Sequence, residues 1–215
     1  MTMTMVEDPI VEIAARNLFF VKDVVERSEA KTSDKFDIYD PQSRKLLLEV
    51  REPDLGVLTK AARLMGKHPI TGIGADAKAP FNYVVSTPEG PKVLRIVKGS
   101  SSFRVAQIKF FDGADNTICS LEKIAFCIGR KYRGMGPAGG SMFTLRVKAG
   151  FTQIVLLVDE KEAARVTSNW KGDHADFYKE GFKYAFSISP DMPNDGFMRN
   201  FLLALGLSYK RALEG

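Results

Sequence analysis

Residues 196–213 read GFMRNFLLALGLSYKRAL, and the centre of this stretch, from Phe201 to Leu207, is apolar around its whole circumference if it is helical. A helix without a polar face is either buried in protein or lies in a membrane. The apolar centre covers only residues 201–207, whereas a bilayer span needs about 20 residues. We therefore expect a helix over residues 195–212 that is buried inside the protein.

The chain before this helix repeats a unit of strand, turn and strand. The units are DKFDIYD–PQSR–KLLLEVR, FNYVVS–TPEG–KVLRIVK, FRVAQIKFF–DGADN–TICSLEKIAFCI and FTQIVLLV–DEKE–AARVTSN. Their turns use Pro, Gly, Asp, Asn and Ser, and their flanks are rich in β-branched and aromatic residues. In MFTLRVK, Phe143, Leu145 and Val147 fall on one face. These patterns predict antiparallel strands with a core side and a solvent side.

A β shell and one fully buried terminal helix together predict a mainly β fold. We expect a closed antiparallel barrel with the helix through its middle, because only a wide barrel has room for one. The barrel domain is expected over residues 17–215, after an N-terminal segment of residues 1–16. A second helix is expected at residues 55–65, LGVLTKAARLM, where apolar residues recur at helical spacing.

Positive charge is concentrated in the middle of the chain. Residues 55–158 hold 15 Lys and Arg against 5 Asp and Glu, and no acidic residue occurs from Lys123 to Val158. Such segregation favours an anionic partner, namely a phospholipid surface, nucleic acid or an acidic protein, although a charge run can also be an ordinary solvated face.

The stretch RGMGPAGG at residues 133–140 has the spacing G-x-G-x-x-G through Gly134, Gly136 and Gly139. A dinucleotide-binding loop opens a helix whose N-terminus holds the pyrophosphate. Here the stretch leads into MFTLRVK, which alternates with period two. The glycines therefore predict a hairpin between two strands, and no nucleotide cofactor is expected.

We expect no catalytic residue, no metal and no cofactor, because no motif for them is found. The two histidines lack zinc-ligand spacing, and neither a nucleophile elbow nor a Walker loop occurs. Cys119 and Cys127 stand in apolar runs, which is typical of buried inert thiols. The start MTMTMVEDPI lacks the basic segment of a secretory signal. A reducing, cytoplasmic location is therefore expected.

Several pieces, in this order, resemble the phospholipid scramblase-like family, which is related to the LURP-one-related proteins and to the Tubby C-terminal domain. The resemblance covers about residues 18–213. The pieces are REP at 51–53, APFNYVVSTPEG at 79–90, VLRIVKGSSSFR at 93–104, VDEKEAARVTSNWKG at 158–172 and RNFLLALGLSYKRAL at 199–213.

The resemblance implies a 12-stranded antiparallel barrel around a hydrophobic C-terminal helix, and contact with anionic phospholipids. The chain departs from the family scramblases because it lacks their Pro-rich N-terminal region and their Cys-rich palmitoylation cluster. Their acidic calcium segment corresponds to GDHADFYKEGF, whose acids, Asp173, Asp176 and Glu180, do not have EF-hand spacing. We interpret this segment as a surface loop before the last strand.

We therefore expect a non-enzymatic peripheral membrane protein or adaptor that binds anionic phospholipid headgroups of the phosphoinositide type. Lys and Arg side chains on neighbouring strands would hold the phosphates. The candidate lipid-binding residues are Arg130, Lys131, Arg133, Arg146 and Lys148, and a second group of Lys92, Arg95, Lys98, Arg104 and Lys109. The alternatives are a nucleic-acid-binding Tubby-type module, and an enzyme or carrier with a hydrophobic ligand in the barrel.

Overall fold

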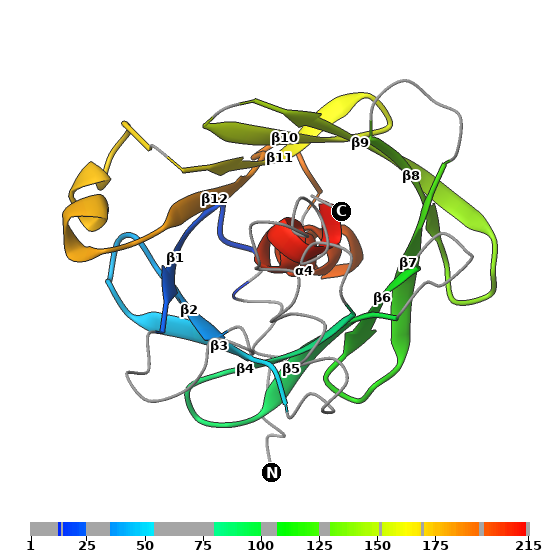
Figure 1. Ribbon diagram of the computed structural model, residues 1–215, viewed down its shortest axis with the longest axis horizontal. Coiled ribbons are helices and arrows are strands. Elements are labelled where there is room, and N and C mark those ends of the chain that lie inside the picture. The colour runs from blue at the N-terminus through cyan, green and yellow to red at the C-terminus, as the bar shows by residue number, and fades with distance from the viewer. Residues whose placement is uncertain are drawn as a thin grey trace, which may run out of the picture.

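Twelve strands in the described part of the chain form one closed antiparallel barrel (Figure 1). The computed structural model describes residue 13 and residues 15–24, 35–53, 80–99, 107–124, 130–150, 152–168, 170–193 and 196–213. The strands are β1 (Leu18–Asp23), β2 (Lys35–Tyr39), β3 (Leu46–Arg51), β4 (Phe81–Ser86), β5 (Lys92–Lys98), β6 (Ile108–Asp112), β7 (Thr117–Lys123), β8 (Arg130–Met135), β9 (Ser141–Ala149), β10 (Gln153–Val158), β11 (Lys161–Thr167) and β12 (Tyr184–Ile188).

Each strand pairs with its neighbours in the sequence, and the first strand pairs with the last. At this seam Phe19 of β1 lies opposite Phe186 of β12, and Val21 lies opposite Tyr184. Closure pairs every strand on both sides, so no sheet edge is left open. The predicted closed antiparallel barrel is confirmed, with the strand number that the resemblance implied.

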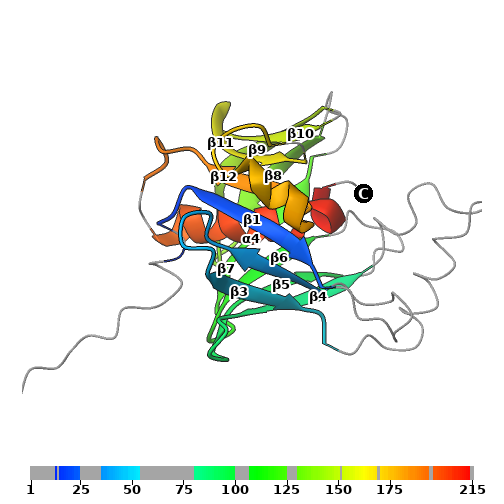
Figure 2. The same ribbon diagram turned by 90° about the vertical axis from the view of Figure 1, so that its left-hand side faces the viewer.

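The helix α4 (Gly196–Leu213) runs through the middle of the barrel, as the end-on view and the side view both show (Figures 1 and 2). Every side chain from Phe201 to Ser208 is buried. The ring centroid of Phe201 lies 5.2 Å from the ring centroid of Phe110 on β6 and 4.9 Å from that of Phe143 on β9. Full burial of one large apolar side chain contributes about 1.5–3 kcal/mol. The helix is therefore the centre of the hydrophobic core, as its apolar circumference predicts.

Arg199 fixes the start of this helix to the chain that leads into β1. Its guanidinium donates to the carbonyl oxygens of Met192 at 3.1 Å and of Ala15 and Arg16 at 3.2 Å, and it also contacts the side chain of Asn17. Ile13 is buried in the same core. Residue 13 thus packs with the barrel core, although the sequence analysis placed it in the N-terminal segment of residues 1–16.

The two ends of the barrel differ in their connections. At one end, short turns join β2 to β3, β4 to β5, β6 to β7, β8 to β9 and β10 to β11, and these turns fall at or beside the PQSR, TPEG, GADN, GPAG and DE segments of the sequence. The connections at the other end include residues 25–34, 54–79, 100–106 and 125–129. These lie outside the described residues, and with them lie the helix predicted at 55–65 and Cys127.

The glycine-rich stretch joins β8 to β9, so the predicted hairpin is confirmed. Gly136 donates its N–H to the carbonyl oxygen of Gly140 at 2.8 Å, and Gly139 takes a φ of +84° in the turn. Gly134 lies two residues before Gly136, within β8, and is paired with Phe143 of β9. A Cβ at Gly134 would come within 2.3 Å of the Phe143 ring, so this glycine makes room for the ring in the core.

Residues 170–183 cover part of the outer surface of the barrel and include the short 3₁₀ helix η1 (Ala175–Glu180), seen outside β1 and β12 in Figure 1. Phe177 and Phe182 pack on Phe20 of β1, at ring-centroid distances of 4.5 and 6.2 Å. We name residues 170–183 the outer strap. The loop predicted before the last strand is thus present, and it forms a second, smaller apolar cluster outside the barrel wall.

Candidate anion-binding face

The outer side of β8 and β9 carries the first group of candidate cations. Tyr132 of β8 and Leu145 of β9 are paired and buried. Because side chains alternate along a strand, the residues next to them point outward. Lys131 and Arg146 are such neighbours, and they lie directly opposite each other in the ladder. The hairpin therefore sets two cations side by side on the outer surface.

Both cations contact one carboxylate, that of Glu160 in the turn between β10 and β11. Arg146 Nη1 lies 2.9 Å from Glu160 Oε2, and Lys131 Nζ lies 3.8 Å from Glu160 Oε1. Like charges in directly opposed positions destabilise a sheet, so an anion between them offsets their repulsion. The sequence analysis did not find Glu160, because its approach to Lys131 depends on how the turn folds back over β9.

The turn that carries Glu160 is fixed by its other residue. Asp159 donates its N–H to the carbonyl oxygen of Thr144 at 2.9 Å and accepts the N–H of Thr144 on Oδ1 at 2.8 Å. Asp159 and Glu160 have φ values of 47° and 65°, a left-handed pair typical of tight hairpin turns. The backbone at residue 160 is therefore held by contacts that do not involve the Glu160 side chain.

Arg133 of β8 and Lys148 of β9 stand on either side of the Lys131–Arg146 pair, and both are exposed. Within the described residues neither has an ion-pair partner. Arg133 lies opposite Glu122 of β7 in the ladder, but the Glu122 carboxylate accepts a hydrogen bond from Gln107 at 2.9 Å. These two side chains are therefore open to an external anion.

Lys109 of β6 is a further exposed outer cation, two strands away from β8. We define the basic face as the outer side chains Lys109, Lys131, Arg133, Arg146 and Lys148. Glu122, Asp159 and Glu160 are the carboxylates beside them. Five cations against three carboxylates leave an excess of two positive charges. Met142, at the start of β9, is 51% exposed at the edge of this face.

Arg130 does not belong to the basic face, although the sequence grouped it there. It lies opposite Val147, which is buried, so alternation turns its side chain to the side of the barrel interior at the start of β8. It is half-buried and has a contact of its own. Burial raises the pKa of the neighbouring Tyr132, and the positive charge of Arg130 acts in the opposite direction.

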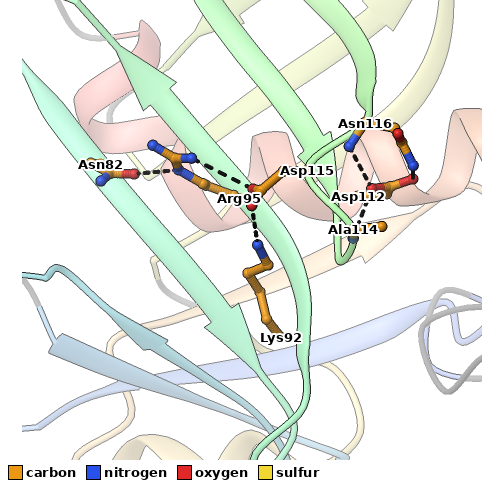
Figure 3. Close-up of polar contacts among 7 residues, drawn as sticks. All are labelled: Asn82, Lys92, Arg95, Asp112, Ala114, Asp115 and Asn116. Atoms are coloured by element: carbon orange, nitrogen blue, oxygen red, sulfur yellow. Dashed lines mark hydrogen bonds and ion pairs between the residues drawn. The ribbon is translucent and has the colours of Figure 1, made fainter.

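Of the second predicted group, Lys92 and Arg95 form a surface pair and Lys98 is buried. Lys109 lies on the basic face, and Arg104 lies outside the described residues. Lys92 Nζ lies 2.5 Å from Asp115 Oδ2, and Arg95 Nη1 lies 3.5 Å from Asp115 Oδ1 (Figure 3). Arg95 also donates from Nε to Asn82 at 3.0 Å. Hydrogen bonding to Lys92 is the largest influence on Asp115, and it holds the pKa of that carboxyl below its usual value. This pair is already partly neutralised.

The turn that presents Asp115 is built by Asp112 (Figure 3). Asp112 Oδ1 accepts the backbone N–H groups of Ala114 at 2.9 Å and of Asn116 at 2.8 Å, and Oδ2 accepts the Asn116 side chain at 3.0 Å. The acidic residues of this segment are therefore occupied by the turn and by the Lys92–Arg95 pair, in line with a turn between strands.

Lys98 is 6% exposed at the end of β5. It follows Leu94 and Ile96 on the inward side of the strand, so it cannot join an outer face. The alternation of inward and outward residues in VLRIVK already places Lys98 on the inward side of the strand. A count of basic residues along the chain does not distinguish the two sides, so it grouped Lys98 with surface residues.

The acidic residues of the outer strap are paired with Arg44 of the β2–β3 turn. Arg44 forms ion pairs with Asp176 and Glu180 and stacks over the ring of Phe177, 4.9 Å from its centroid. Among the described residues there is no group of three His, Cys, Asp or Glu side chains that could hold a metal ion.

Cys119 lies in the core, where burial raises the pKa of its thiol to about 12. A thiol with so high a pKa is a poor nucleophile at neutral pH. Cys119 therefore matches the expected buried inert thiol, whereas Cys127 lies outside the described residues.

No protein-family model matches the chain, and no curated protein matches it. Among solved structures, the chain is similar to a protein from Arabidopsis thaliana at 13% sequence identity, with a TM-score of 0.46 over 89% of this chain and 91% of the other. No helix among the described residues is long and apolar enough to cross a membrane.

Proposed function

We propose that the protein is a non-enzymatic peripheral membrane protein that binds anionic phospholipid headgroups through the basic face. The observation that carries this proposal is the excess of two positive charges on the outer side of β6 to β9, with Arg133 and Lys148 exposed and without an ion-pair partner in the described residues. The resemblance to scramblase-like and Tubby-type proteins supports the same ligand class. The proposal places the protein in the cytoplasm, at membranes that contain anionic lipids.

The expected affinity is low and sensitive to salt. A Lys or Arg near an anionic membrane contributes about 1 kcal/mol, so an excess of two charges contributes about 2 kcal/mol, or roughly a 30-fold partition. The exposed Met142 beside these charges can add apolar contact with the interface. Binding should therefore be clear at low ionic strength and fall steeply as the Debye length shortens.

The alternative functions fit these side chains less well. Proteins that bind single-stranded nucleic acid without sequence preference stack bases on aromatic side chains, but the outer positions of β8 and β9 carry Lys, Arg, Thr, Ser and Met. A carrier of a hydrophobic ligand would need space inside the barrel. There the side chains of Phe201 to Ser208 are buried against the barrel wall.

Co-sedimentation with vesicles tests the proposal. The protein is mixed at low salt with vesicles of phosphatidylcholine alone, or with added phosphatidylserine or a phosphoinositide, and a DNA gel shift is run at the same salt. We expect retention by the anionic vesicles only. If neither kind of anionic vesicle retains the protein, the lipid proposal is wrong, and a DNA shift without vesicle binding would support the nucleic-acid alternative.

Charge reversal locates the binding face. The double variant Arg133→Glu/Lys148→Glu should lose most of the retention. The matched control is Lys45→Glu/Lys171→Glu, which makes the same charge change at two exposed residues, one in the β2–β3 turn and one in the outer strap. If both double variants lose retention equally, binding follows net charge and this face is not the site.

A further inference from the structure

The Glu160 carboxylate occupies a position between two cations that an external anion could occupy instead. Arg146 contacts one of its oxygens at 2.9 Å and Lys131 the other at 3.8 Å. The carboxylate therefore bridges β8 and β9 as a two-oxygen anion would.

The contacts of Glu160 can be exchanged without disturbing the fold. Its side chain is 54% exposed, and the turn is held on β9 by Asp159 and Thr144. Exposed ion pairs of this kind are worth little, because water screens them. A rotation of the Glu160 side chain would free both Lys131 and Arg146 while the backbone stays in place.

We propose that Glu160 competes with the ligand for Lys131 and Arg146. A phosphate monoester group of the ligand would bind at the position of the Glu160 carboxylate, which we call the seat. This inference rests on the proposed function and deepens it. A phosphate monoester carries a charge of about −1.5 to −2 near neutral pH and three acceptor oxygens. It can therefore replace the singly charged carboxylate at Lys131 and Arg146, with the exposed Arg133 and Lys148 on either side of the seat.

A phosphodiester headgroup is a weaker competitor, because its phosphate carries a single negative charge. A group tethered in the same chain acts at a high effective concentration, so an external monoanion gains no electrostatic advantage over Glu160. The ligand class expected at this seat is thus the lipid phosphate monoester, as in phosphatidate or a phosphoinositide.

The substitution Glu160→Asp tests the competition without changing the net charge. Asp is shorter by one methylene and tolerates positive φ well, so the turn should keep its shape while the carboxylate withdraws from Lys131 and Arg146. We expect Glu160→Asp to raise binding to phosphatidate vesicles about 2- to 5-fold, in keeping with loss of an exposed pair. The matched control is Glu162→Asp, which shortens an exposed acid that pairs with Arg165 of β11, outside the basic face, and should leave binding unchanged.

The outcomes separate this inference from the proposed function. If the wild-type protein binds the vesicles but Glu160→Asp binds equally or less, Glu160 only orients the cations and the competitor is ruled out, while the lipid proposal stands. If the wild type, Glu160→Asp and Glu160→Gln all fail to bind, the proposed function itself is wrong. A gain that is equally large for Glu162→Asp would also overturn the inference.

A parallel titration with glycerol 3-phosphate identifies the source of the monoester. Chemical-shift changes at the backbone amides of Lys131 and Arg146 that grow in Glu160→Asp would show a seat for free monoesters as well. A gain on vesicles without these shifts would assign the seat to the lipid headgroup. In a Lys131→Gln/Arg146→Gln background the gain from Glu160→Asp should disappear, and its persistence would place the competing site elsewhere.

Discussion

Gly206 of α4 faces the ring of Phe186 on β12 at a distance that leaves no room for a side chain. A Cβ built on Gly206 would lie 2.5 Å from Phe186 Cε2 and 2.6 Å from its Cδ2 and Cζ. Phe186 is fully buried and also stacks on Phe19, at 6.2 Å between ring centroids. The glycine in the middle of an otherwise apolar helix therefore sets how closely the helix approaches the barrel wall.

The substitution Gly206→Ala brings two effects into opposition. Alanine is the better helix former by about 1 kcal/mol, whereas an added methyl in a tightly packed core costs about 1–3 kcal/mol. The ring of Phe186 is fully buried and cannot turn away into solvent, so we expect overpacking to outweigh the helix propensity and the free energy of unfolding to fall, by up to about 2 kcal/mol. Urea unfolding followed by circular dichroism measures this change.

Gly140→Ala is the control, because a Cβ at Gly140 meets no atom within 4 Å. Its unfolding free energy should stay within about 0.5 kcal/mol of the wild type. A Gly206→Ala protein that is more stable than the wild type would mean that the helix shifts readily inside the barrel.

Gly134 and Phe143 form a second close pair, in which the ring on β9 covers the glycine on β8. Gly134→Ala should destabilise the protein by about 1–3 kcal/mol, because Phe143 also packs against Phe201 and cannot withdraw freely. A double-mutant cycle with Phe143→Leu should show a coupling of at least about 0.5 kcal/mol, as expected for residues in contact. Simple additivity of the two substitutions would contradict the packing described for this pair.

The fold could be predicted from the sequence because the patterns that indicate it are local. The apolar circumference at Phe201 to Leu207 predicts a buried helix, and period-two alternation at Phe143, Leu145 and Val147 predicts an inner and an outer face. Both patterns need only a few neighbouring residues, and the structure confirms both.

The candidate site could be predicted from the sequence only in part, because its contacts depend on the register of the strands and on how the turns fold back over them. Lys131 meets Arg146 through the β8–β9 ladder, and Glu160 reaches both from the next hairpin. A linear count of charges shows none of this. It also grouped Lys98 with surface residues, although alternation with Leu94 and Ile96 turns Lys98 inward.

Arg44 should hold the outer strap on the barrel, and its removal should loosen the strap without unfolding the barrel. The residue lies more than 130 positions from its partners Asp176 and Glu180, so its ion pairs join distant parts of the chain. Trp170, the single tryptophan of the chain, packs at the edge of the strap cluster and reports its state. Arg44→Gln should shift the Trp170 emission to the red and speed amide exchange in residues 170–183.

The neighbouring exposed residue supplies the control for the strap. Lys45→Gln removes a positive charge one position away, and its spectrum should match that of the wild type. High salt should produce part of the Arg44→Gln effect, because exposed ion pairs are screened. An unchanged emission in Arg44→Gln would mean that the apolar contacts of Phe177 and Phe182 hold the strap by themselves.

Arg199 should be needed to hold the start of α4 in place. Its guanidinium donates hydrogen bonds to carbonyl oxygens of two separate segments, at Met192 and at Ala15 and Arg16. Burial lowers its pKa, which reflects the cost of holding the charge at this end of the barrel. Arg199→Met keeps much of the volume but leaves these acceptors unpaired, at a cost of about 2–4 kcal/mol. Calorimetric unfolding tests this value, and a neutral or stabilising effect would show that the apolar contacts of the helix are sufficient.

Asp40 should make the stability of the protein fall at acid pH. Its side chain is 8% exposed, lies 3.1 Å from Arg16 Nη1 and accepts a hydrogen bond from Ser43 Oγ at 2.6 Å. Burial raises the pKa of this carboxyl, but hydrogen bonds from Ser43 and the charge of Arg16 outweigh that effect, so the pKa lies below its usual value. A lowered pKa in the folded state stabilises the protein above the unfolded pKa of about 3.9.

This contribution is lost as the pH falls from about 4 through the lower folded-state pKa, because the unfolded chain takes up the proton first. Asp40→Asn should therefore be less stable than the wild type by about 1–3 kcal/mol at pH 7, and the difference should shrink below pH 4. Urea unfolding of both proteins at pH 7, 5, 4 and 3 measures it, with the exposed Asp191→Asn as a control that should show no such trend. A difference that stays constant down to pH 3 would mean that Asp40 acts through its shape and hydrogen bonds alone, without its charge.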